Sequence, residues 1–230
     1  MMSITKHIQA IAFDYYGTLV EIGQPFERIR EWFDRFLQRS GRNSKELSDA
    51  FFMRFSRERA ALANAEKYRP GYEILTTSYV RACERYHLLA DEDDFSLFVC
   101  ELFLRPQAYA GAVELVASLR QRYRVGLITN ADNGILRQSI LRRGFLFDFV
   151  VTSEDVGCCK PHPAVFECAL ELERLSPNQM LMVGDSPVED IMGAKQCGMP
   201  AVQICRQGEL PGEGCIRQLS QLRQLLDDAV

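Results

Sequence analysis

Two patterns of hydrophobic and polar positions divide this chain of 230 residues. From Gln107 onward, short runs rich in apolar and β-branched residues alternate with longer segments of helical period. The predicted strands cover residues 125–129, 147–152, 180–183 and 201–205. The predicted helices between and after them cover residues 133–144, 162–175, 187–198 and 216–230. Strands that alternate with helices in this way indicate βαβ units around a parallel sheet.

The segment from Ile22 to Arg105 has helical periodicity and no comparable strand. Its first helix is predicted from apolar residues that recur on one face, namely Phe26, Ile29, Phe33, Phe36 and Leu37. Ser44 is the expected N-cap of a second helix, and further helices are predicted over residues 74–86 and 95–104. Breaks at residues 23–25 and 105–106 flank the segment. We therefore predict an α/β core of residues 1–21 and 106–230, with a helical insert of residues 22–105.

Polar residues follow several of the predicted strands. A first apolar run ends at Asp14, and Gly17 and Thr18 then turn the chain. Other strand ends carry Thr129 with Asn130, then Asp185, and Lys160 lies in a loop between them. Functional residues of an open parallel sheet gather at the carboxyl ends of its strands, so these side chains are expected to meet. Each also has a simpler interpretation, because such residues commonly cap helices or lie in solvated loops.

Composition and charge narrow the class of partner. The net charge of -4 disfavours a nucleic-acid-binding face, which normally requires a basic domain. No apolar run approaches the ~18 residues of a membrane span, and the first residues lack the apolar stretch of a signal peptide. These features predict a soluble, cytoplasmic protein, monomeric or homodimeric, that acts on a small molecule and contacts neither nucleic acid nor membrane.

The polar strand ends belong to four short motifs. They are DxxGTL from Asp14 to Leu19, ITN ending at Asn130, KP at Lys160, and VGDSPVED from Val183 to Asp190. In this order, the four segments resemble the motifs of the haloacid dehalogenase (HAD) superfamily, and the helical insert resembles its type-1 cap. The resemblance covers essentially the whole chain. It implies a doubly wound parallel α/β sheet, the Rossmann-like HAD core, with an inserted α-helical cap.

The chemistry of the motif residues is that of phosphoryl transfer. A carboxylate such as Asp14 can attack phosphorus if its charge is offset, forming an aspartyl-phosphate that water later opens. A phosphate dianion cannot easily approach Asp14, Asp185 and Asp190 with Lys160 alone for compensation. A hard divalent cation with oxygen ligands is therefore expected, and magnesium fits.

The resemblance also implies roles for individual residues. The metal ligands would be the carboxylates of Asp14 and Asp185 and the backbone carbonyl of Tyr16. Asp190 would ligate through water or orient Lys160. The oxygens of a small phosphorylated substrate would be held, as charge builds on them, by residues from three motifs, namely Thr18, Thr129, the Asn130 backbone and Lys160.

Tyr16 departs from the phosphatase pattern. In the phosphatase members of the family, the residue two positions after the nucleophile is usually an aspartate that acts as general acid and base. A phenol has an ordinary pKa near 10, so roughly one molecule in a thousand is ionised at pH 7. Acid or base assistance is typically worth about 10²- to 10⁴-fold. We therefore expect slow hydrolysis of alkyl phosphates and better rates on phenyl or acyl phosphates.

Two alternatives remain at this point. The DxYGTL pattern resembles the 2-haloacid dehalogenases, in which the aspartate attacks carbon and halide leaves without protonation. Those enzymes are metal-free, carry Ser or Asn near the position of Asp185, and use a tyrosine near the position of Phe166 and an arginine in the early cap. Asp185 would repel the carboxylate of a haloacid. The other alternative is a HAD fold that binds a phosphorylated ligand with little turnover.

Overall fold

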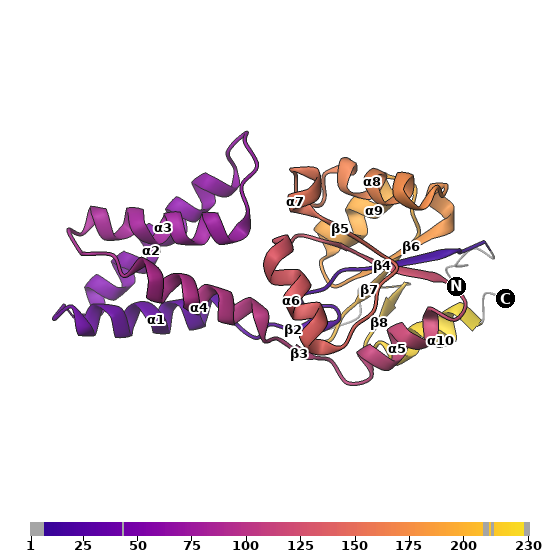
Figure 1. Ribbon diagram of the computed structural model, residues 1–230, viewed down its shortest axis with the longest axis horizontal. Helices are drawn as coiled ribbons and strands as arrows, with labels where there is room; N and C mark the ends of the chain where they lie inside the picture. Colours follow the sequence, from indigo (N-terminus) through magenta and orange to yellow (C-terminus); the bar gives the residue numbers. More distant parts are fainter. Residues whose placement is uncertain (1–6, 43, 209–211, 213, 228–230) are drawn as a thin grey trace. The chain divides into compact units, whose positions relative to one another are not determined.

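The computed structural model describes residues 7–42, 44–208, 212 and 214–227. Its chain divides into two compact units, one formed by Met1–Glu21 with Pro106–Val230 and the other by Ile22–Arg105. The first unit is an α/β structure and the second is helical (Figure 1). In the part of the chain that is described, no helix is long and apolar enough to cross a membrane.

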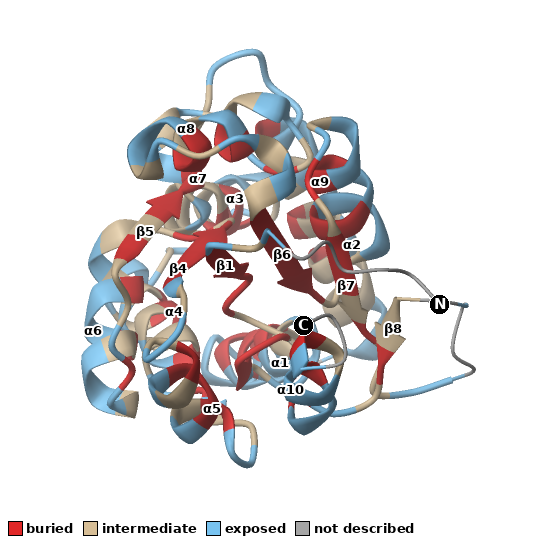
Figure 2. Ribbon diagram, turned by 90° about the vertical axis from the view of Figure 1, so that its right-hand side faces the viewer, coloured by how far each residue is buried: buried red, intermediate tan, exposed pale blue. Residues whose placement is uncertain are grey.

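The α/β unit is built on a parallel sheet of six strands in the order β5-β4-β1-β6-β7-β8. The strands are β1 (Ala10–Phe13), β4 (Arg124–Thr129), β5 (Phe149–Thr152), β6 (Met180–Gly184), β7 (Ala201–Ile204) and β8 (Cys215–Ile216). The central strand β1 pairs with β4 on one side and with β6 on the other. Its four residues are fully buried, as expected for a strand covered on both faces (Figure 2).

Helices cover both faces of this sheet, so the predicted doubly wound α/β class is confirmed. On one face, Ile11 and Phe13 pack with α5 (Ala112–Leu119), α6 (Asn133–Arg143) and α10 (Ser220–Asp227). On the other, Ala10 and Ala12 pack with α8 (Pro163–Glu173), η2 (Pro187–Met192) and α9 (Gly193–Gln196). The alternation along β1 is what a period of two requires of a strand between two helical layers.

Several short elements were not predicted from the sequence. They are α5, α7 (Ser153–Val156), the 3₁₀ turn η1 (Pro177–Gln179), β8, and the antiparallel pair of β2 (Val20–Glu21) with β3 (Gln107–Ala108). The helix predicted over 187–198 is a π-helical turn, η2, followed by the short α9. Of the amphipathic segment predicted over 216–230, residues 220–227 form α10, and residues 228–230 lie outside the described residues.

The helical unit contains α1 (Pro25–Arg39), α2 (Lys45–Ala63), α3 (Gly71–Arg85) and α4 (Glu92–Leu104). Ser44 caps α2 as predicted, because its Oγ accepts a hydrogen bond from the backbone N–H of Leu47 at 3.1 Å. The core is aromatic and includes Trp32 and Phe33. Phe26, predicted on the buried face, is 42% exposed, and its ring lies under the guanidinium of Arg59.

Candidate active site

Asp14 lies at the carboxyl end of the central strand β1. Its backbone N–H donates to the carbonyl of Val183 in β6 at 2.9 Å, which continues the pairing of the two strands by one residue. The residue is almost fully buried, with 7% of its surface exposed. The sheet therefore presents this carboxylate at its centre, between β4 and β6, as predicted for the carboxyl ends of parallel strands.

The turn after Asp14 is packed against the carboxylate of Asp185. Gly17 has φ of +91°, a conformation that favours glycine, and a Cβ there would lie 2.7 Å from Oδ2 of Asp185. Thr18 donates from its hydroxyl to Oδ1 of Asp185 at 3.1 Å. The glycine and the hydroxyl of this turn thus both allow it to contact Asp185 closely.

Lys160 is the buried cation of the site. Its ammonium donates to Oδ1 of Asp14 at 2.9 Å, to Oδ1 of Asp190 at 2.5 Å, and to the carbonyl of Ile128 at 2.9 Å. Burial by itself would lower the pKa of Lys160, but the charges of Asp14 and Asp190 outweigh burial and raise it. The lysine is therefore a permanent positive charge rather than a proton donor or acceptor.

Thr129 and Asn130, at the end of β4, bind different parts of the site. The Thr129 hydroxyl donates to Oδ1 of Asp14 at 2.9 Å. The Asn130 side chain accepts from the backbone N–H of Lys160 at 2.8 Å and donates to its carbonyl at 3.2 Å. Thr129 therefore orients the carboxylate of Asp14, while the Asn130 side chain fixes the loop that carries Lys160. The second role was not predicted.

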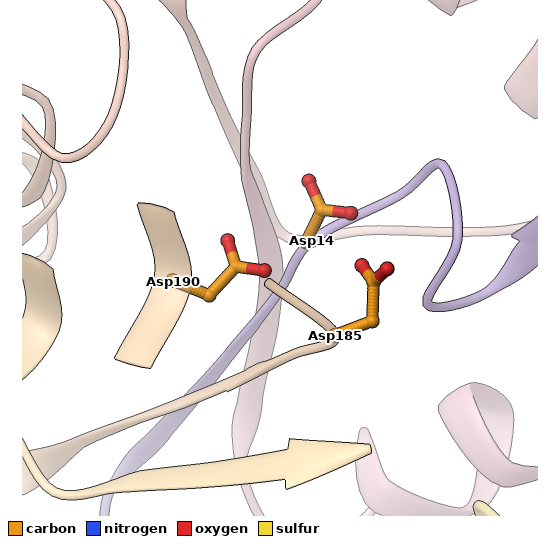
Figure 3. Close-up of side chains that lie close together, drawn as sticks. All are labelled: Asp14, Asp185 and Asp190. Carbon is orange, nitrogen blue, oxygen red and sulfur yellow. The ribbon is translucent and has the colours of Figure 1, made fainter. Parts of the chain in front are cut away.

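Asp14, Asp185 and Asp190 bring their carboxylates together (Figure 3), with oxygens that all lie within 4.8 Å of one another. Burial, followed by the charge of Asp14, raises the pKa of Asp185 above its ordinary value. The same two causes raise the pKa of Asp190 to about 7, against the opposing charge of Lys160. The ammonium of Lys160 bonds two of the three carboxylates, those of Asp14 and Asp190, so the three acids together carry more negative charge than this lysine offsets. An all-oxygen donor set of this kind fits a hard divalent cation.

Tyr16 follows Asp14 by two residues and is half-buried. Its ring packs edge-on against that of Tyr15, with centroids 5.0 Å apart. Burial raises the pKa of the Tyr16 phenol, and the neighbouring Tyr15, Asp132 and Asp14 raise it further. The phenol therefore stays neutral at physiological pH.

Two residues beyond β6 also contact the site and were not predicted. Gln203 donates from its side-chain amide to the carbonyl of Asp185 at 3.1 Å. Arg206 donates to the carbonyls of Gly17 and Thr18. Gln203 lies in β7 and Arg206 two residues after it. Because β7 was predicted, its carboxyl end is the feature of the sequence that could have indicated both residues.

Comparison with known proteins assigns the chain to a family. The chain belongs to the haloacid dehalogenase-like hydrolase family, whose profile matches residues 8–198. This confirms the resemblance inferred from the four motifs.

Individual relatives match over shorter stretches. The haloacid dehalogenase-like hydrolase domain-containing protein 3 of Xenopus laevis is 38% identical over 108 residues, which are 43% of this chain and 43% of that protein. The pyrimidine 5'-nucleotidase YjjG of Escherichia coli is 33% identical over 125 residues, 50% of this chain and 55% of the relative. The chain thus spans about half the length of these relatives.

Solved structures match over nearly the full chain. The HAD-hydrolase YfnB of Bacillus subtilis, whose structure was solved bound to magnesium, has a TM-score of 0.74, with 96% of this chain and 100% of the other covered at 20% identity. At this identity the likeness establishes the fold alone. The relatives and structural neighbours include phosphatases as well as L-2-haloacid dehalogenases.

Proposed function

We propose that this hydrolase is a magnesium-dependent phosphatase that acts on a small phosphorylated substrate through an aspartyl-phosphate on Asp14. One observation carries the proposal. The buried Asp14 carboxylate is bonded to the ammonium of Lys160 and lies within 4.8 Å of the oxygens of Asp185 and Asp190. A nucleophilic carboxylate, a fixed cation and a set of oxygen ligands are the parts that phosphoryl transfer requires.

The nucleophile is held for attack by its neighbours. Thr129 and Lys160 both donate to Oδ1 of Asp14, which fixes the orientation of the carboxylate. A carboxylate oxygen of Asp14 attacks phosphorus, and the bond from phosphorus to the leaving oxygen breaks. Water then attacks the aspartyl-phosphate at phosphorus, which releases inorganic phosphate and restores the carboxylate of Asp14.

The charge that develops on the phosphoryl oxygens is offset by groups already in place. Lys160 supplies a full positive charge and the Asn130 backbone N–H supplies a hydrogen-bond donor. The hydroxyls of Thr129 and Thr18, which donate to Asp14 and Asp185 in the structure, turn to the phosphoryl oxygens. Asp190, at 2.5 Å from the ammonium, orients Lys160. Because Lys160 and the backbone of Asn130 belong to the folded framework, only the two hydroxyls have to turn as the charge builds.

Asp14, Asp185 and the backbone carbonyl of Tyr16 would hold the magnesium ion. When bound, it supplies a positive charge that lets a phosphate dianion approach the acidic cluster. The cluster itself supports this assignment. Without a cation, the negative charge of its three carboxylates would exceed the positive charge of the one lysine and would repel a phosphate dianion.

Tyr16 sets the preference among substrates. A neutral phenol is a poor base, and a leaving alkoxide requires a proton that an aspartate at this position would supply. Acyl and aryl phosphates have leaving groups that depart without protonation. We therefore propose that the enzyme favours substrates with good leaving groups.

Two observations weigh against dehalogenation as the main activity. Asp185 adds a negative charge beside Asp14, which would repel the carboxylate of a 2-haloacid. Phe166, near the position where the dehalogenases use a tyrosine, is fully buried in the apolar cluster on one face of the sheet. Neither the charge nor the packing fits a site that binds a haloacid.

The test is phosphate release from acetyl phosphate, p-nitrophenyl phosphate and a sugar phosphate, with and without magnesium, and with Asp14→Asn as the blank. The expected result is magnesium-dependent release that is absent from the blank and strongest with acetyl and p-nitrophenyl phosphate. Silence across the panel would contradict the proposal. Halide release from 2-chloropropionate would then support a dehalogenase, and silence there as well would support a ligand-binding protein.

Substitution of Tyr16 by aspartate tests the reason for the substrate preference. If the native site lacks its acid and base, Tyr16→Asp should raise the rate on the sugar phosphate by about 10²-fold or more, with a smaller gain on acetyl phosphate. An equal change on both substrates, or none, would mean that another group supplies the proton.

A further inference from the structure

Arg206 lies outside the four motifs, two residues after β7, yet it contacts the turn that follows the nucleophile. Its guanidinium donates through one nitrogen to the carbonyl of Gly17 and through the other to the carbonyl of Thr18 at 2.6 Å. A planar fork that holds two successive carbonyls fixes both peptide planes at once. Arg206 is therefore attached to the backbone of the turn.

This turn carries two contacts with the acidic cluster. The Gly17 backbone approaches Asp185 so closely that a Cβ would lie 2.7 Å from its carboxylate, and the Thr18 hydroxyl donates to the same group. The carbonyl of Tyr16 shares a planar peptide with the N–H of Gly17, which donates to the carbonyl of Val20 at 2.8 Å. The peptides after Tyr16, Gly17 and Thr18 are thus held in succession, the last two by Arg206.

Arg206 also contacts the segment by which the chain returns from the helical unit. Its guanidinium carbon lies 3.4 Å from the centroid of the Tyr109 ring. The backbone N–H of Tyr109 donates to the carbonyl of Leu19 at 3.0 Å, next to the β2–β3 pairing. One guanidinium therefore ties together the turn after Asp14 and the returning segment.

We propose that Arg206 is a positioning residue for the divalent cation: it fixes the turn at residues 16–18 so that the Tyr16 carbonyl and the Asp185 carboxylate are held in place to bind the ion. The inference rests on the proposed function, because it assumes a cation at this site. Residues that hydrogen-bond to metal ligands and so orient them typically account for 10- to 100-fold in metal affinity. A loss of about tenfold or more is expected when the fork is removed.

The positive charge of Arg206 by itself would weaken cation binding, whereas positioning of the turn would strengthen it. The direction in which the affinity changes on substitution therefore distinguishes the two roles. Arg206 interacts electrostatically with Asp185, and a positive charge beside a cation site weakens cation binding. If the residue acted only as a charge, Arg206→Ala would bind the cation more tightly and Arg206→Lys would bind it unchanged. If it positions the turn, both variants bind the cation more weakly, because an ammonium cannot hold two carbonyls and lie flat on a ring.

The experiment is isothermal titration calorimetry of the full chain with magnesium chloride. Arg217→Ala is the matched control, since Arg217 is a neighbouring arginine that also donates to a backbone carbonyl, that of Cys205 at 3.3 Å, but does not contact the turn. We expect Arg206→Lys and Arg206→Ala to weaken binding by about 10- to 100-fold and Arg217→Ala to leave it within about twofold. Equal binding by wild type and Arg206→Lys, or tighter binding by Arg206→Ala, would overturn the inference.

Two further measurements separate positioning from general damage and from failure of the metal site. At saturating magnesium, Arg206→Lys should recover a kcat close to that of wild type, whereas a variant that is merely misfolded would stay inactive and would overturn the positioning role. Asp185→Asn should abolish the calorimetric signal. No binding by wild type, or full binding by Asp185→Asn, would overturn the cation site and this inference with it; a failure confined to the Arg206 variants leaves the proposed function standing.

Discussion

Replacement of Lys160 by methionine gives the sharpest test of the buried charge cluster. The side chain is 1% exposed, and its ammonium donates to Asp14, to Asp190 and to the carbonyl of Ile128. Methionine fills a similar volume but offers no charge and no donor. The substitution therefore leaves two buried carboxylates facing each other without a cation.

The loss of stability can be worked from this arrangement. Breaking a buried ion pair by removing one partner typically costs about 3–5 kcal/mol. The folded variant limits the loss by protonating one carboxyl. At about pH 7 that means a proton taken up some three units above the ordinary pKa of aspartic acid, which costs about 4 kcal/mol. Both routes give the same range, so we expect the free energy of unfolding to fall by about 3–5 kcal/mol.

The measurement is urea unfolding followed by far-UV circular dichroism in magnesium-free buffer. Because the folded-state pKa of a buried carboxyl in the variant lies above its unfolded value, stability falls as the pH rises; the deficit should therefore shrink when the pH is lowered to about 5. Lys195→Met is the control, since Lys195 is exposed on α9 and its loss should change stability by no more than about 0.5 kcal/mol. A deficit below about 1 kcal/mol for Lys160→Met, or one independent of pH, would refute the reasoning.

Two other substitutions test the framework of the sheet. Gly126→Ala should lower the free energy of unfolding by about 1–3 kcal/mol in the same urea assay, because its Cβ would lie 2.4 Å from the backbone carbonyl of Phe149 on β5. An unchanged unfolding midpoint would contradict this, since it would mean that β4 and β5 move apart at no cost. Asp148 accepts from Arg120 at 2.6 Å and from the N–H of Val125 at 2.9 Å, and the Arg120 hydrogen bond holds its pKa below the ordinary value. A carboxyl with a lowered folded-state pKa stabilises the fold at any pH above its unfolded pKa, so Asp148→Asn should cost about 1.5–3 kcal/mol near neutral pH. The difference should begin to shrink as the pH falls below about 4 and vanish only below the lowered folded-state pKa of Asp148. A difference that does not shrink in acid would contradict this.

The strands of the sheet were predictable because burial on both faces demands continuous apolar runs. β4, β6 and β7 begin and end within one residue of the predicted bounds. Strands β2, β3 and β8 have two residues each and are defined only by their partners. The π-helical turn η2 has a local cause: the N–H groups of Asp190 and Ile191 share the carbonyl of Ser186, while the Asp190 carboxylate accepts from the N–H of Ser186.

The residues of the site also divide into those that the sequence could predict and those that it could not. Asp14, Thr129, Lys160, Asp185 and Asp190 could be named from the sequence because their chemistry lies in their side chains and each belongs to one of the four motifs. The role of the Asn130 side chain could not, because it binds the backbone of Lys160, and the backbone carries no signal in the sequence. The same holds for Arg206, whose acceptors are the carbonyls of Gly17 and Thr18.

The nucleophilic role of Asp14 is tested most directly by trapping the covalent intermediate. The protein is mixed with acetyl phosphate and magnesium, quenched in acid, and digested for mass spectrometry of the peptide that contains Asp14. Because Tyr16 is a poor base for the water that opens the aspartyl-phosphate, the intermediate should accumulate. We predict one phosphoryl group on Asp14, dependent on magnesium and absent from Asp14→Asn. Steady phosphate release with no phosphoryl group on Asp14 at any time after mixing would contradict the proposed mechanism.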